Sequence, residues 1–405
     1  MLDGEPAAAE IIDATEIQHL VALLRADGYT VIAPTLHDGV ISSAEIESAD
    51  DLPAGWTARQ TPGNYRLERR DDAALFGYVV GPHSPRRQLH PSRLKLWGAR
   101  RDAAGEIILD DMEASPPRYA FVGLRGCELD AIGVQDRVFQ SHDHADPDYA
   151  SRRAAAFIVA VDCAEPASTC FCTSMGGDPG VDAQTTGSDQ AGQAGQAGQT
   201  AGIDARRHDL VLTELLDADS HRFIVRAGSA AGSRLLARLE HRKAEPAELE
   251  QRESILATAR QAIGRTLDTR GLKESLQANA EHPRWDEIAE RCLGCANCTL
   301  VCPTCFCSSV EEVGDLAGER AERWRRDDSC FTLDFSYIHG GSVRVSTRSR
   351  YRQWLTHKLA HWIDQFGTSG CVGCGRCITW CPVGIDITEE ARVLASPPPA
   401  TRPQG

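Results

Sequence analysis

Cysteine is the residue type whose spacing in this chain most clearly predicts a chemistry. Two runs of the form C-x2-C-x2-C-x3-C-P lie in the last third of the chain, at residues 292–303 and 371–382. Bacterial ferredoxins use this spacing to bind two 4Fe-4S clusters: three thiolates of each run hold one cluster, and the fourth crosses to the other. A zinc site takes its ligands in two pairs and does not need this pattern. The runs therefore predict two 4Fe-4S clusters that carry single electrons.

The crossing of the fourth cysteine gives two expected ligand sets. The first cluster is expected to be bound by Cys292, Cys295, Cys298 and Cys381. The second cluster is expected to be bound by Cys371, Cys374, Cys377 and Cys302. Gly294, Gly373 and Gly375 lie inside the runs and allow the backbone to wrap closely around the sulfur atoms.

Four more cysteines lie where strands of an α/β region are expected to end. Cys127 follows one apolar run in a glycine-flanked turn, and a second apolar run is followed by Cys163, Cys170 and Cys172. Ligand sites gather at strand ends, and Arg125 with a helix that begins near Cys127 would supply positive potential to an anionic cluster. Two hypotheses stay open: a third 4Fe-4S cluster, or buried apolar Cys127 and Cys163 beside a Cys170–Cys172 pair that binds nothing or part of a zinc site.

The last three cysteines fit neither run. Cys305 and Cys307 directly follow the first run, and Cys330 stands alone. A further metal centre at these thiols would need a fourth ligand, such as His339. The alternatives are thiols that contact cluster ligands without binding iron, or simple core packing.

The elements that must position these cysteines divide the chain into an α/β part and a helical part. Helical spacing is expected at residues 11–24, 128–139 and 233–239. Strands are expected at residues 29–33, 75–80, 119–124, 156–161, 209–212 and 222–225. We predict a mixed α/β N-terminal domain over residues 1–240, a helical linker over 241–285, and a mostly helical dicluster ferredoxin-like domain over 286–392.

Three segments lie outside this simple division. Residues 180–202 contain the repeat QAGQAGQAGQ and predict a flexible surface insertion, and residues 393–405 predict a disordered tail. A long insertion separates the two cysteine runs. Within it, residues 343–345 resemble a strand and residues 351–365 a helix whose apolar face packs around the clusters.

Composition excludes several classes of protein. The 405 residues carry a formal charge of −15, which argues against a nucleic-acid partner. No apolar stretch reaches the roughly 18 residues of a membrane span, and the acidic N-terminus lacks the features of a signal peptide. Free thiols in such number fit a reducing compartment, so we expect a cytoplasmic protein. No dinucleotide-binding fingerprint is visible, so flavin or nicotinamide binding would belong to another subunit.

Residues 291–307 resemble the iron–sulfur beta subunit of cytoplasmic NAD(P)-linked nickel–iron hydrogenases, the sulfhydrogenases, and the related iron–sulfur subunit of anaerobic sulfite reductase is similar in the same places. The likeness extends to residues 122–132, to Cys163 with residues 169–172, and to residues 370–377, while residues 183–201 depart from it. It implies an electron-transfer subunit that lies between the small subunit of the hydrogenase and a flavin/NAD(P)-binding subunit, or one that works with sulfite reductase subunits. It also implies that this protein holds no catalytic metal, and it favours the third cluster.

In a rival hypothesis, the protein is a catalytic subunit of a sulfite or sulfur reductase, with Cys305, Cys307 and Cys330 acting on a sulfur compound. The direction of electron flow is not readable from the sequence, because cluster potentials depend on hydrogen bonds and solvent access. The arginine-rich segments 320–326 and 344–352 are candidates for partner contact or ordinary solvated charge.

Overall fold

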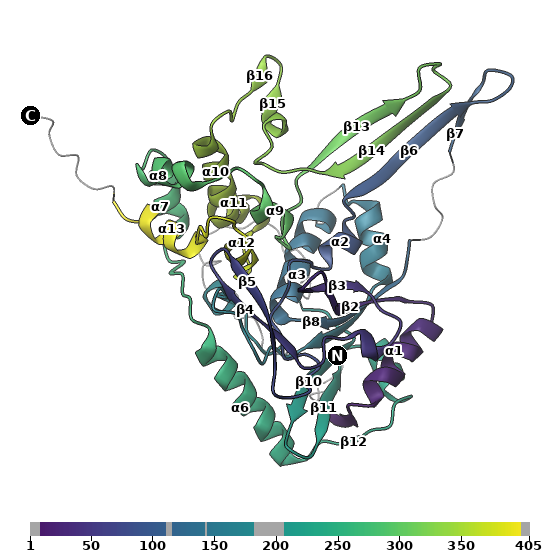
Figure 1. The fold of residues 1–405 in the computed structure, drawn as a ribbon. Helices are drawn as coiled ribbons and strands as arrows, with labels where there is room; N and C mark the ends of the chain where they lie inside the picture. Colours follow the sequence, from purple (N-terminus) through teal and green to yellow (C-terminus); the bar gives the residue numbers. More distant parts are fainter. Residues whose placement is uncertain (1–8, 111–115, 142–143, 182–205, 398–405) are drawn as a thin grey trace, which may run out of the picture.

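The computed structural model describes residues 9–110, 116–141, 144–181 and 206–397 (Figure 1). Most of the predicted insertion at 180–202 and of the predicted tail at 393–405 lies outside the described residues. The part of the tail that is described begins in a helix, α13, which spans Ile387–Leu394. No described helix is long and apolar enough to cross a membrane.

An eight-stranded sheet forms the N-terminal half, in the order β12-β1-β11-β10-β9-β8-β2-β3. The central strands β2, β8, β9 and β10 run parallel, and the flanking pairs are antiparallel. Their bounds are β1 Glu10–Asp13, β2 Thr30–His37, β3 Val40–Glu45, β8 Tyr119–Leu124, β9 Phe157–Val161, β10 Leu210–Leu216, β11 His221–Ala227 and β12 Arg242–Lys243. The predicted α/β region is therefore present.

Helices cover both faces of this sheet, which explains why its central strands are apolar without interruption. Helices α1 (Glu16–Ala26) and α5 (Ala230–Leu236) pack in one apolar cluster with one face. Helix α3 (Gly126–Gln140) packs with the other face, together with Tyr149 of α4 (Pro147–Ala155) and Leu89 of α2 (Arg86–Leu89). All five residues of β9 are buried.

Two predicted elements of this region are wrong in detail. Residues 75–80 form no strand, because the backbone N–H groups of Leu75 and Phe76 donate to the Glu214 carboxylate at 2.6 and 2.9 Å instead of to a neighbouring strand. Ile11 and Ile12, expected at the start of a helix, belong to β1, and the helix begins only at Glu16.

A second sheet joins segments that lie far apart in the sequence and extends from the body of the molecule (Figure 1). It consists of β6 Arg93–Arg101, β7 Ile107–Leu109, β13 Ser308–Gly314 and β14 Arg320–Asp327. Strand β14 pairs with both β13 and β6, so the insertion between the cysteine runs completes a sheet with the N-terminal half. The expectation of a mostly helical C-terminal part is only partly correct for this reason.

Helices do form the rest of the C-terminal part, and most of them pack around one apolar cluster that includes Trp285, Tyr351 and Trp354, whereas Ile255 packs against the N-terminal sheet. They are α6 Pro246–Ala262, α7 Leu272–Ala278, α8 Arg284–Arg291, α9 Asn297–Leu300, α10 Thr347–Thr356, α11 Trp362–Phe366, α12 Arg376–Thr379 and α13. A π-helical turn, His357–His361, joins α10 to α11, so the helix predicted at 351–365 is present. The strand predicted at 343–345 is not: the hairpin there is β15 Tyr337–Ile338 with β16 Gly341–Ser342.

Candidate iron–sulfur sites

Site 1 is a cavity of about 410 Å³ that all four cysteines of the first expected set line, namely Cys292, Cys295, Cys298 and Cys381. Aromatic side chains complete its inner wall, among them Phe331, Tyr351 and Trp354. Its outer rim reaches the surface, because Cys295 is exposed and Leu293 is 66% exposed. Cys295 is the one exposed cysteine among the fifteen. Site 1 therefore combines an apolar interior with one open edge.

Site 2 is a cavity of about 310 Å³ lined by the whole second set, Cys302, Cys371, Cys374 and Cys377. Two cationic side chains, Lys358 and Arg376, also line it, and both are buried. The Thr304 hydroxyl lies 3.1 Å from the Cys302 sulfur. Site 2 is thus enclosed where site 1 is open.

Backbone amides point at the sulfur atoms of both sites. The N–H of Gly294 donates to Cys292 Sγ and that of Gly373 to Cys371 Sγ, each over 3.4 Å. In site 1, the N–H of Ile385 also donates to Cys381 Sγ over 3.3 Å. Such N–H···S bonds stabilise thiolates that bind iron–sulfur clusters, so the donor sets and their surroundings suit 4Fe-4S clusters.

Site 3 brings together the four cysteines of the N-terminal half, Cys127, Cys163, Cys170 and Cys172, around a cavity of about 400 Å³. They come from three local settings: the first turn of α3, the loop after β9, and the approach to the 3-10 turn Cys172–Met175. The strand-end positions expected from the sequence therefore converge. Burial raises the pKa of all four thiols, that of Cys172 to about 12, so these groups ionise only when a cation replaces the proton.

The three sites lie in one row, because neighbouring cavities share a cysteine. Cys377 lines both site 1 and site 2, and Cys374 lines both site 2 and site 3. The loop at residues 169–172 rests directly on the second run: the Phe171 N–H donates to the Gly373 carbonyl over 2.8 Å. Site 2 is consequently the middle of the row.

One buried arginine lines site 3, and another lines the adjoining site 2. Arg125 lines site 3 and donates to the carbonyl oxygens of Phe76, Tyr78 and Asp162, so the positive charge expected there is present. Arg376 was not singled out from the sequence, although it stands inside the second cysteine run. It donates to the Glu128 carboxylate over 2.7 Å, and the thiols of Cys374 and Cys127 add to the raised pKa of the guanidinium.

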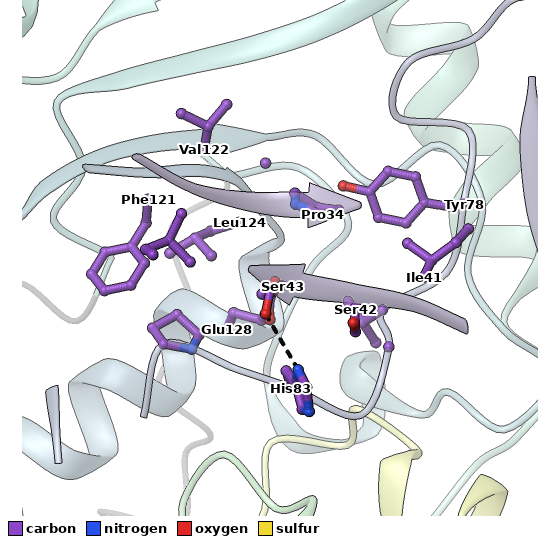
Figure 2. Close-up of a pocket in the computed structure, with 15 residues that line it drawn as sticks. Pro34, Ile41, Ser42, Ser43, Tyr78, His83, Phe121, Val122, Leu124 and Glu128 are labelled. Atoms are coloured by element: carbon purple, nitrogen blue, oxygen red, sulfur yellow. Dashed lines mark hydrogen bonds between the residues drawn. The ribbon is translucent and has the colours of Figure 1, made fainter. Parts of the chain in front are cut away.

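A further cavity, of about 420 Å³, adjoins site 3 (Figure 2). Val80 lines both cavities, and Glu128, the partner of Arg376, lines this one. The His83 ring contacts the Ser43 carbonyl oxygen over 3.3 Å, and burial lowers the pKa of the ring, which keeps it neutral. No cysteine lines this cavity, so it contributes no thiolate to the row.

The last three cysteines contact other thiols. A hydrogen bond with Cys305 lowers the pKa of Cys302, a member of site 2, and Cys330 lowers the pKa of Cys307 to about 7. His339 lies exposed at the β15–β16 turn. Among the described residues, no three His, Cys, Asp or Glu side chains are close enough to hold a single metal ion. The structure therefore gives no support to a further centre with His339.

Comparison with known proteins agrees with the cysteine runs. Residues 291–385 match the family model of a 4Fe-4S dicluster domain, so this part of the chain places it among iron–sulfur proteins of the ferredoxin type. The chain is also 31% identical over 368 residues to "Sulfhydrogenase 2 subunit beta" of Pyrococcus furiosus, an alignment that covers 89% of this chain and 92% of the relative. The chain belongs to the family of sulfhydrogenase beta subunits, and it is an iron–sulfur electron-transfer subunit. No solved structure matches it.

Proposed function

We propose that this subunit holds three 4Fe-4S clusters, one in each of sites 1, 2 and 3, and relays single electrons along the row. The observation that carries the proposal is the sharing of cysteines between neighbouring cavities: Cys377 borders sites 1 and 2, and Cys374 borders sites 2 and 3. The proposed ligands are the four-cysteine sets of the three sites. Each bound cluster would supply the capacity to accept and release one electron.

The chain's own residues provide what such a relay needs. Aromatic side chains exclude water from the inner wall of site 1, and Phe171 lines site 2 with no exposure to solvent. Backbone N–H groups hold the negative charge of the thiolates. Low solvent access and fixed donors also set cluster potentials, so these residues would determine where an electron rests.

For the third cluster there is a definite alternative, namely that the four cysteines of site 3 are simply packed in the core. The convergence of four cysteines from three local settings on one cavity supports a cluster over simple core packing, because four thiolates are the donor set of a 4Fe-4S cluster. Arg125, with its guanidinium buried at the cavity wall, supports an anionic occupant.

The proposed partners, at opposite ends of the row, are the small subunit of a nickel–iron hydrogenase and a flavin/NAD(P)-binding subunit, both in the cytoplasm. The relative is a beta subunit of a sulfhydrogenase, which supports a multi-subunit enzyme. Sulfite reductase subunits are the alternative partners. If this protein were instead the catalytic subunit of a sulfite or sulfur reductase, the isolated protein would turn over a sulfur compound with an artificial reductant. We expect no such turnover.

Iron and acid-labile sulfide per anaerobically purified chain test the proposal. Three 4Fe-4S clusters predict about twelve irons per chain, with spin counting after reduction in agreement. The matched control is Cys170→Ser, which removes one thiol of site 3 and is expected to leave about eight irons. About eight irons in the wild-type protein, with the same number in Cys170→Ser, would mean that only sites 1 and 2 hold clusters and that site 3 holds none.

A further inference from the structure

Lys358 is a buried ammonium group at the middle of the row. It lies in the π-helical turn His357–His361 and is 3% exposed. Its Nζ donates to Thr304 Oγ1 and to the Gly370 carbonyl oxygen, each over 3.0 Å, and lies 5.4 Å from the centroid of the Trp362 ring. Lys358 also lines the cavity of site 2.

The local fold holds this ammonium group in place. Gly370 packs so closely against Trp362 that a Cβ atom at this position would overlap the indole ring, which brings the Gly370 carbonyl within reach of the lysine. Thr304 is fully buried, and its hydroxyl lies between Lys358 and the Cys302 sulfur. Single π-helical turns of this kind occur frequently at functional sites.

No carboxylate balances this charge among the described residues. Two other buried cations near the row pair with a carboxylate, Arg376 with Glu128 over 2.7 Å and Arg206 with Asp130 over 2.8 Å, whereas the Arg125 guanidinium at site 3 donates to backbone carbonyl oxygens. A buried ammonium group without a partner is strongly unfavourable. Lys358 instead faces sulfur atoms: it lines site 2 with Cys302 and Cys371, and the thiolate forms of Cys302, Cys305 and Cys371 would raise its pKa.

We propose that Lys358 raises the reduction potential of the cluster in site 2, so that the middle of the row holds an electron more readily than site 1. This inference rests on the proposed function. Reduction adds one electron, and hence one negative charge, to an already anionic centre. A fixed positive charge nearby stabilises the reduced form more than the oxidised form, and the lysine keeps its proton in both.

The position of Lys358 makes this effect large compared with that of surface charges. Charge–charge interactions are strong in the enclosed interior and are weakened by water and salt at the surface. At site 1, a nearby cation is Arg350, whose guanidinium lies beside Gly294 and which is partly accessible to solvent. The two sites should therefore differ in potential although their ligands are the same.

Potentiometric titration followed by EPR spectroscopy tests this inference on the full-length protein. Lys358→Met and Lys358→Gln both remove the charge, and Gln keeps a hydrogen-bond donor for Thr304. The matched control is Lys273→Met, which removes a lysine that pairs with Asp364 on the surface of the same helical part. Iron and sulfide are counted in every preparation.

We expect one reduction step to move to lower potential in both Lys358 variants, with wild-type iron content and the other steps unchanged, and no step to move in Lys273→Met. Full iron content with all steps at their wild-type potentials would overturn the inference. Loss of iron in both Lys358 variants would also overturn it, because the lysine would then be needed to form the site rather than to tune it. A wild-type protein without reducible clusters would instead contradict the proposed function.

Discussion

The two cysteine runs have identical spacing, yet the sites to which each contributes three cysteines differ in their exposure to solvent and in the charges around them. Site 1 reaches solvent at Cys295, whereas site 2 is enclosed and faces the buried charges of Lys358 and Arg376. The loop at residues 169–172 of the N-terminal half packs on the second run and closes it. Identical cysteine spacing is thus combined with different packing around each run, and we expect that packing to make the two sites behave differently.

One pair of equivalent positions shows this difference directly. The residue after the second cysteine is Ala296 in the first run and Gly375 in the second, and both have left-handed backbone, with φ of +67° and +74°. Alanine is accepted in the first run despite the backbone strain. In the second run, a Cβ atom would overlap the backbone of Thr169. Glycine is needed there because another part of the chain rests on it.

Replacing the fourth cysteine of a run, which is expected to bind the cluster of the other run, should have the largest effect and should remove one cluster without the other. Cys381→Ser is expected to remove the cluster of site 1, and Cys302→Ser that of site 2, each with a loss of about four irons per chain. Iron analysis and EPR spectroscopy measure both. If either variant kept its full iron content, the crossed ligand assignment would be wrong.

Gly375→Ala should have the next largest effect, because strain and overlap act together. Left-handed backbone costs an alanine about 1–2 kcal/mol, and forcing a methyl group into a packed region costs about 1–3 kcal/mol more. We expect the free energy of unfolding to fall by about 3 kcal/mol in anaerobic denaturant titrations. Because Thr169 adjoins Cys170, iron should be lost first from site 3. An unfolding free energy equal to that of the wild type would contradict the close packing of the two halves.

The cysteine sets and the central strands could be predicted because both depend on local pattern. Spacing alone grouped the eight ferredoxin-type cysteines, and continuous apolar runs marked β8 and β9. The sheet of β6, β7, β13 and β14 could not be predicted, because its strands pair across more than half the chain. The strand predicted at residues 75–80 is wrong for the same reason, since backbone N–H groups there donate to the carboxylate of Glu214, which is distant in the sequence. At site 2, Arg376 stands inside the cysteine run itself, but the burial of Lys358 against Thr304 and Gly370 is a product of tertiary packing.

Ala296→Gly should make the first run more stable without changing its site. Glycine adopts left-handed backbone without the penalty of about 1–2 kcal/mol that alanine pays, but it loses more entropy on folding, by about 0.5–1 kcal/mol. We therefore expect the free energy of unfolding to rise by about 0.5–1 kcal/mol, with iron content and reduction potentials unchanged. A decrease in stability would mean that the Ala296 methyl group, which packs against the C-terminal apolar cluster, contributes more than the strain that it imposes.

Arg350→Met should have the smallest effect and gives the sharpest test of the contrast between the two sites. Arg350 donates to the Val345 carbonyl oxygen over 2.9 Å. Burial raises the pKa of Cys292, and the Arg350 guanidinium is a minor influence in the opposite direction. Its removal should lower the potential of site 1 only slightly, on the order of 10–20 mV, because solvent has partial access to this charge and screens it. The shift should shrink further as salt is raised from about 0.05 to 0.5 M, since the screening length falls. The shift caused by Lys358→Met should persist at both salt concentrations. Equal salt dependence in the two variants would mean that solvent reaches site 2 as freely as site 1. The proposed contrast between an open site 1 and an enclosed site 2 would then be wrong.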